Sequence, residues 1–99
     1  MAAGSSFVHG KLATLRYRYT ADERTAFTFV VSGKAAPRAV DRNLLKRRGR
    51  AILRTLLPVL SPGYLCAFFF KKEAVGQPYR VLSAEIRELL TKARILKQI

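Results

Sequence analysis

The feature that most constrains the fold is an apolar and basic stretch between Ala39 and Leu57, which ends just before Pro58. If successive residues turn by about 100°, as in a helix, the apolar side chains of this stretch gather on one side. We assign to that side Val40, Leu44, Leu45, Ala51, Ile52 and Leu56. Proline lacks an N–H group and ends helices, so the stretch predicts an amphipathic helix from about residue 39 to residue 57.

The other side of this expected helix carries a ladder of cations. Its members are Arg42, Lys46, Arg50 and Arg54 at a spacing of four, with Asn43 and Arg47 between them. Like charges at this spacing repel by roughly 0.2–0.5 kcal/mol per pair, so solvation alone explains the ladder poorly. The whole chain holds 19 Lys and Arg against 6 Asp and Glu, a net charge of +13. We therefore interpret the ladder as a surface for a polyanion, with nucleic acid as the leading partner.

The overall composition indicates one compact domain over residues 1–99. Hydrophobic residues make up 49% of the chain, which is enough for a core. The longest uncharged run, residues 55–70, is too short to cross a bilayer and contains Pro58 and Pro62, so an anionic membrane is the weaker partner and no span is expected. The single cysteine allows no internal disulfide, and we expect a reducing, cytoplasmic setting.

The remaining elements are expected to be three strands and one more helix. Strands are predicted over residues 13–20, 26–32 and 64–71, the first two paired as a hairpin. The third strand is apolar throughout, so we expect it in the centre of the sheet with both faces covered, parallel to the second. A last helix is expected to begin at Ser83 as its N-cap. The order strand, strand, helix, strand, helix predicts an α+β fold, a small mixed sheet with helices packed on one side.

The chain has few residues that could carry catalysis, whereas it has many that could contact RNA. Neither His9 nor Cys66 has a partner at the spacing of a metal site or a nucleophile and base, so we expect no catalytic residue and no protein-bound metal. In the first strand, Arg16 and Arg18 alternate with Tyr17 and other apolar residues. Cations for phosphates combined with aromatic rings for unpaired bases are typical of RNA-binding proteins.

The basic stretch and its flanks resemble the bacterial ribonuclease P protein component. The matching run is Val31-Ser32-Gly33-Lys34, then Ala39-Val40-Asp41-Arg42-Asn43-Leu44-Leu45-Lys46-Arg47-Arg48-Gly49-Arg50-Ala51. Further matches are Pro62-Gly63-Tyr64 before an apolar strand ending in Lys71-Lys72, and Leu89-Leu90-x-Lys92-Ala93 in the last helix. The chain departs from the family pattern at Gly33, Leu44 and Ala51. It also resembles an N-terminally short member, in which residues 1–11 are a flexible segment or the remnant of the family's first helix.

This resemblance implies the ribonuclease P protein-like fold, shared with the second domain of ribosomal protein S5. It implies a cytoplasmic ribonucleoprotein that removes the 5′ leader from precursor tRNA, in which the RNA subunit carries the catalysis with Mg²⁺. The protein is then the subunit of an endoribonuclease holoenzyme that binds this RNA and the precursor tRNA, with no obligate protein partner. The residues implied to bind RNA are Ser32, Lys34, Arg38, Arg42, Asn43, Lys46, Arg47, Arg50 and Arg54. Those implied to contact the leader, less firmly, are Phe7, Arg16 and Arg18.

Three other readings of the residues remain open at this point. A ribosomal or general RNA-binding protein of similar fold would share the charge and the fold class. A self-contained enzyme would cleave its substrate without an RNA subunit. A DNA-binding module would place the basic helix in the major groove, although no helix-turn-helix pattern is evident.

Overall fold

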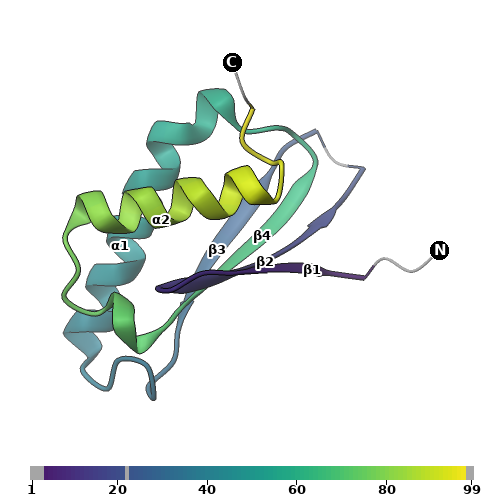
Figure 1. The fold of residues 1–99 in the computed structure, drawn as a ribbon. Coiled ribbons are helices and arrows are strands. Elements are labelled where there is room, and N and C mark those ends of the chain that lie inside the picture. Colours follow the sequence, from purple (N-terminus) through teal and green to yellow (C-terminus); the bar gives the residue numbers. More distant parts are fainter. Residues whose placement is uncertain (1–3, 22, 98–99) are drawn as a thin grey trace.

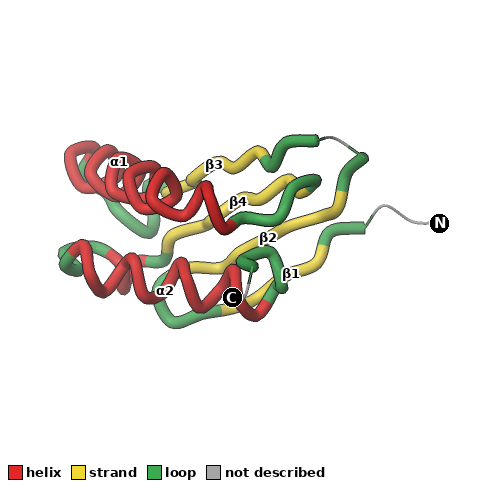
Figure 2. Tube along the Cα trace, turned by 90° about the horizontal axis from the view of Figure 1, so that it is seen from above, coloured by secondary structure: helices red, strands yellow, loops and turns green. Residues whose placement is uncertain are grey.

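The computed structural model describes residues 4–21 and 23–97. Its elements, in chain order, are β1 (Ser6–His9), β2 (Ala13–Tyr19), β3 (Ala26–Val31), α1 (Ala39–Leu56), β4 (Tyr64–Phe70) and α2 (Tyr79–Lys92), with short 3₁₀ turns η1 (Leu57–Val59) and η2 (Lys72–Ala74). Figure 1 shows a four-stranded sheet with both helices on the same side of it, and Figure 2 shows the same two layers from above. The α+β class with helices on one side is therefore confirmed.

The sheet is mixed, and its strand order is β1-β2-β4-β3. β4 pairs antiparallel with β2 and parallel with β3, so it is the central strand, as predicted. The predicted hairpin between residues 13–20 and 26–32 is wrong, because β4 lies between these two strands. Because β4 is apolar, it is suited to the central position in the sheet. It therefore lies between β2 and β3, which are adjacent in the sequence but not in the sheet.

The N-terminal segment also differs from the prediction. Residues 6–9 form strand β1, which pairs antiparallel with β2, Phe7 lying opposite Arg16. These residues are therefore neither a helix remnant nor flexible, while residues 1–3 of that predicted segment lie outside the described residues. The full element order is strand, strand, strand, helix, strand, helix.

The core lies between the sheet and the two helices, and three stacked rings form its centre. The rings of Phe29 and Phe68 are 5.2 Å apart between centroids, and those of Phe29 and Phe70 are 5.9 Å apart. Phe68 and Phe70 are buried, in agreement with the prediction of core positions, whereas Phe69 points to the other face and is half-buried. α2 contributes the buried side chains of Leu82, Ile86, Leu89 and Leu90.

α1 packs on this core through a face that differs in part from the predicted one. Its buried residues are Leu45, Gly49, Ile52, Leu53 and Leu56. Val40, which was assigned to the apolar side, is 59% exposed, and Leu44 and Ala51 lie at the border of the buried face. Gly49, which was not counted as an apolar contact, lies in the buried face against Phe29 of the sheet.

Gly49 is required by the ring of Phe29. A Cβ atom at position 49 would lie 2.6 Å from Cε1 of Phe29, a separation that side chains do not tolerate. A glycine inside a helix costs about 1 kcal/mol relative to alanine, so its presence here reflects the close helix–strand contact rather than helix propensity. The contact holds α1 against β3 and thereby sets the height of the cationic helix above the sheet.

The last helix begins five residues before the predicted start. Its N-cap is Pro78, and Ser83 lies inside the helix. The extended backbone of Pro78 (ψ 156°) precedes the first helical residue, and an earlier start allows Leu82 to join the buried face. Glu85 is therefore an interior residue of α2.

Glu85 holds the turn between β1 and β2 in place. Its Oε2 atom accepts the backbone N–H groups of Leu12 (2.8 Å) and Ala13 (3.1 Å). Lys71 adds a second tie, since its Nζ donates to the carbonyl oxygen of Gly10 at 2.7 Å. A Cβ atom at Gly10 would collide with Glu85 Oε2 while that atom holds the turn, so a residue without a side chain suits this position. These contacts fix the edge strand β1 to the helical layer.

Replacing Gly49 by alanine is expected to destabilise the protein, although alanine favours helices. The added methyl group meets the Phe29 ring, and overpacking of this kind costs about 1–3 kcal/mol. Urea unfolding measures the loss. In a Phe29→Leu background the same Gly49→Ala change should cost clearly less, and equal costs in the two backgrounds would contradict the assigned contact.

Replacing Glu85 by alanine is expected to lower the free energy of unfolding by about 1–3 kcal/mol, because two partly buried N–H groups lose their acceptor. The matched control is Glu88→Ala in the same helix, which removes only an exposed ion pair with Lys92 and should stay within about 0.5 kcal/mol of the original protein. Thermal or urea unfolding of both variants tests this, and equal effects would show that Glu85 does not hold the turn.

Candidate nucleic-acid interface

The exposed side of α1 carries most of the predicted RNA-binding residues. Asn43, Arg47, Arg50 and Arg54 are exposed there, and Lys46 is half-buried beside them. Within the described part of the chain, none of these four cations has a carboxylate within ion-pair distance. Their charges are therefore not neutralised by the described acidic side chains, and they form a continuous positive strip along the helix.

Arg42 lies at the border of this strip and is engaged within the protein. Its Nη1 atom donates to the carbonyl oxygens of Ala36 (2.8 Å) and Pro37 (2.9 Å), and its side chain is half-buried. Arg42 thus differs from the freely exposed cation that the ladder implied. It ties the loop before α1 to the first turn of the helix.

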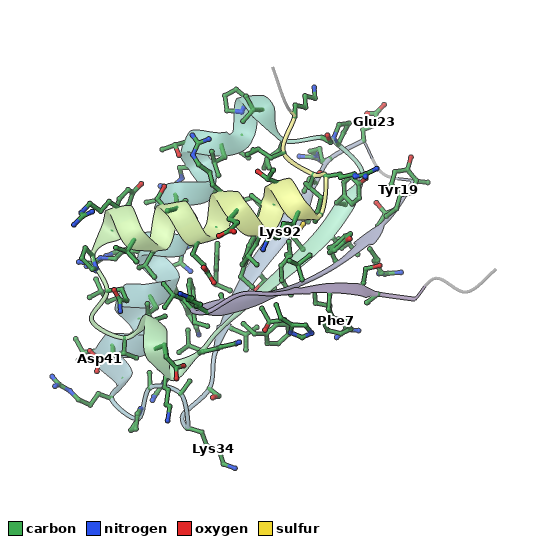
Figure 3. All side chains as sticks on the ribbon, viewed as in Figure 1. Phe7, Tyr19, Glu23, Lys34, Asp41 and Lys92 are labelled. Atoms are coloured by element: carbon green, nitrogen blue, oxygen red, sulfur yellow. The ribbon has the colours of Figure 1, made fainter. Side chains whose placement is uncertain are left out.

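The loop between β3 and α1 presents further predicted residues. Ser32 Oγ accepts the N–H of Ala35 at 3.0 Å, which closes a turn that leaves Lys34 at its tip. Figure 3 shows Lys34 pointing away from the body of the protein. Arg38, at the N-cap of α1, is also exposed, and its Nε lies 3.8 Å from Asp41 Oδ2. The loop and α1 therefore form one surface, which we call the α1 surface and define by Lys34, Arg38, Asn43, Lys46, Arg47, Arg50 and Arg54.

A second candidate surface is the face of the sheet opposite the helices. Strand alternation places Phe7, Arg16 and Arg18 on this open face, so the three predicted leader contacts lie together. β4 contributes Leu65, Ala67 and Phe69 to the same face, all at least partly exposed. The prediction that both faces of this strand are covered is therefore wrong, because the structure has helices on one side only.

The open face contains a hollow of about 320 Å³. The register aligns Arg16 with Ala67 and Thr28 across β2, β4 and β3, and Arg18 with Leu65 and Ala26. The short side chains on β3 and β4 leave space beside the two long arginines of β2. The result is a shallow hollow with an apolar floor and a cationic wall, which suits a single strand with its bases inward and its phosphates toward the arginines.

β1 adds an aromatic platform at one side of this hollow. The rings of Phe7 and His9 are stacked, with an interplanar angle of 2° and 6.1 Å between centroids. The guanidinium carbon of Arg16 lies 6.0 Å from the centre of the Phe7 ring, and its Nε donates to Ser5 Oγ at 3.1 Å. Figure 3 shows Phe7 on the side of the sheet away from the helices. Phe7 is 54% exposed, so its ring is available for stacking.

Sequence reasoning missed several parts of this open face. His9 was considered only as a metal ligand or catalytic group, and Ala26, Thr28 and Ala67 were not considered. The alternation of β4 held the usable signal, because Ala67 is a small residue among bulky apolar ones and faces away from Cys66 and Phe68. The neighbours across the sheet could not be assigned without the strand order.

Groups for metal binding or nucleophilic chemistry do not gather in the described residues. No three His, Cys, Asp or Glu side chains come together within residues 4–21 and 23–97. Cys66 faces the core, and its burial raises the pKa of the thiol to about 11, which disfavours the reactive thiolate at neutral pH. The two surfaces are therefore suited to binding, by charge and by stacking.

Comparison with known proteins gives a consistent result. A protein-family model described as Ribonuclease P matches residues 2–94. The ribonuclease P protein component of Cyanothece sp. is 44% identical over 66 residues, which cover 67% of this chain and 50% of that protein. The corresponding protein of Synechococcus sp. is 42% identical over 67 residues, covering 68% and 50%. The chain thus spans about half the length of these curated relatives.

A solved structure shares the fold. The RNase P protein of Staphylococcus aureus superposes with a TM-score of 0.84, covering 94% of this chain and 84% of that one, at 15% sequence identity. At this level of identity the similarity establishes the arrangement of strands and helices alone.

The anchoring role of Arg42 predicts a difference between two arginines of the same helix. Arg42→Ala should lower the free energy of unfolding by about 1–2 kcal/mol, because two carbonyl oxygens lose a charged donor. Arg50→Ala, the matched control, removes an exposed cation and should stay within about 0.5 kcal/mol of the original protein. Urea unfolding separates the two, and equal stabilities would mean that Arg42 does not anchor the loop.

Proposed function

The chain belongs to the bacterial ribonuclease P protein family, and from this membership we propose that it is the protein subunit of ribonuclease P. In this proposal it binds the catalytic RNA subunit and assists removal of the 5′ leader from precursor tRNA. The protein takes no direct part in bond breaking, and the holoenzyme acts as an endoribonuclease.

The observation that carries this proposal is that a cationic surface and an open hollow with an aromatic platform lie on opposite sides of one sheet. The α1 surface offers cations of which only Arg38 is paired with a described carboxylate, and this suits the phosphates of a folded RNA. The open face offers a hollow with an aromatic platform, which suits an unpaired strand. A protein with both can hold a folded RNA and a single strand at the same time.

We propose that the α1 surface docks on the catalytic RNA. Arg47, Arg50 and Arg54 neutralise phosphates from the exposed side of the helix, Asn43 adds a neutral hydrogen bond, and Lys34 and Arg38 extend the contact into the loop. Since the helix is held against the core through Gly49, the backbone positions that carry the helical cations are fixed. Little backbone entropy is then lost when they bind.

The open face is proposed to hold the 5′ leader. Arg16 and Arg18 contact its phosphates from β2, and a base stacks on Phe7, whose ring is exposed beside Arg16. Base–aromatic stacking accepts any base, so such a surface can bind leaders of different sequence. Holding the leader raises the local concentration of the scissile bond at the catalytic RNA without any catalytic group on the protein.

Mg²⁺ is assigned to the RNA in this proposal. The described carboxylates do not form a cage for the ion, so the residues present do not fit a protein-bound Mg²⁺ and no step is derived through it. The contribution of the protein is positive charge, which lowers the amount of Mg²⁺ that the RNA needs for folding and substrate binding.

We further propose that the protein works in the cytoplasm, with the two RNAs as its partners and without an obligate protein partner. None of the helices in the described residues is of the length and hydropathy that a bilayer crossing requires. A reduced Cys66 is compatible with this setting.

The test is precursor-tRNA cleavage by the catalytic RNA of the same organism at low Mg²⁺, with and without the protein. The protein should stimulate cleavage, and Arg47→Glu with Arg50→Glu should raise the protein concentration needed for half-maximal stimulation about tenfold or more, since two phosphate contacts become repulsions.

The matched control is Arg80→Glu with Arg87→Glu, which makes the same charge change on the exposed side of α2. This control should retain most of the stimulation. Absence of stimulation by the original protein, with RNA binding intact, would contradict the proposed function and favour a general RNA-binding protein. Cleavage by the protein without any RNA subunit would contradict it in favour of a self-contained enzyme.

A further inference from the structure

The chain makes an unusual turn after α2, at residues 93–97. The N–H of Ile95 donates to the carbonyl oxygen of Leu90 at 3.0 Å, and the N–H of Arg94 donates to that of Thr91 at 3.0 Å. These two bonds define a Schellman motif, whose central residue adopts a left-handed conformation and is usually glycine. Here that residue is Arg94, with φ of 61°.

This turn is fixed to the loop that precedes β4. The N–H of Ser61 donates to the carbonyl oxygen of Ile95 at 2.7 Å, and the N–H of Lys97 donates to that of Val59 at 2.7 Å. An isolated bridge pairs Leu60 with Leu96 between these bonds. The backbone on both sides is therefore held in place, and the side chains that it carries are presented from fixed positions.

The two segments enclose a hollow of about 510 Å³, which is lined by Ser61, Thr91, Arg94, Leu96 and Lys97. Two of these five residues are cations and two carry hydroxyl groups, while none is acidic. Among the described residues, Arg94 and Lys97 have no ion pair, whereas the neighbouring Lys92 is neutralised by Glu88 at 3.4 Å. Of the two hydroxyl groups, that of Thr91 donates to the carbonyl oxygen of Arg87. The Ser61 hydroxyl is therefore the one that can donate to a ligand in the hollow.

We propose that this hollow is a further phosphate-binding site, which takes a backbone phosphate of the catalytic RNA. The guanidinium fork of Arg94 matches two phosphate oxygens, Lys97 adds a second charge, and the Ser61 hydroxyl donates to the same group. Glycine would adopt the left-handed conformation at position 94 without strain. A need for positive charge at this point explains why arginine stands there instead. The inference rests on the proposed function, since it names a third contact to the same RNA.

None of the residues that line the hollow belongs to the α1 surface or to the open face. Figure 1 places the C-terminal segment at the end of the molecule where α1 finishes, and Figure 3, in the same view, places Lys34 at the opposite end. The hollow would therefore add a contact at the same end as the last turn of α1, which carries Arg54.

The experiment compares binding to the catalytic RNA of the same organism as a function of salt concentration, for the original protein and for Arg94→Gly with Lys97→Gln. Each phosphate contact contributes about 0.7–0.9 to the slope of log affinity against log salt. The variant should lose about that amount of slope and bind about five- to tenfold more weakly at moderate salt. Because glycine relieves the left-handed strain, the variant should melt at or above the temperature of the original protein.

The matched control is Arg87→Gln with Lys92→Gln, which removes two cations from α2 outside the hollow and should leave the slope unchanged. Lys97→Gln alone, which leaves the turn intact, should lower the affinity in the same direction as the double variant. Equal slopes for the hollow variant and the control would overturn the proposal while leaving the proposed function standing. Failure of the original protein to bind the RNA at all would overturn both.

Discussion

The central strand β4 is the constraint on which the rest of the structure depends. It pairs along its full length with β2 on one side and over residues 65–70 with β3 on the other, and its alternating side chains supply both faces of the sheet. Cys66, Phe68 and Phe70 face the helices and build the core, while Leu65, Ala67 and Phe69 face outward. One strand thus determines where the core is and where the open hollow is.

The helical layer follows from the same strand. The ring of Phe29 stacks on Phe68 and Phe70, and α1 can approach this stack only because Gly49 has no side chain. The buried side of α1 is therefore assigned to the core, and the cations on its other side are turned outward. Since nothing covers the opposite face of the sheet among the described elements, one small domain offers a cationic helix and an apolar hollow on opposite sides (Figure 2). Arg16 and Phe7 join the hollow through the pairing of β1 with β2.

Local patterns in the sequence predicted the parts that depend on single elements. The helical period of residues 39–56 and the alternation of Arg16 and Arg18 were sufficient to place their cations on exposed faces. Parts that depend on contacts distant in sequence were not predictable. Nothing near Phe7 indicates a strand, because its partner β2 and the anchor Glu85 come from elsewhere in the chain. The burial of Arg42 depends on carbonyl groups of the preceding loop, and Gly49 is explained only by Phe29. The predicted pairing of β2 with β3 was wrong because β4, which comes later in the sequence, lies between them in the sheet.

We propose above all that the two sides of the sheet bind two different RNAs. The most direct measurement attaches an iron-based cleaving reagent to a single introduced cysteine, either Arg50→Cys on α1 or Thr28→Cys in the open hollow, in a holoenzyme assembled with precursor tRNA. The buried Cys66, with the pKa of its thiol raised, should not compete for the reagent. We expect cuts in the catalytic RNA from position 50 and cuts in the 5′ leader from position 28. Leader cuts from position 50, or cuts in the same RNA segment from both positions, would contradict it.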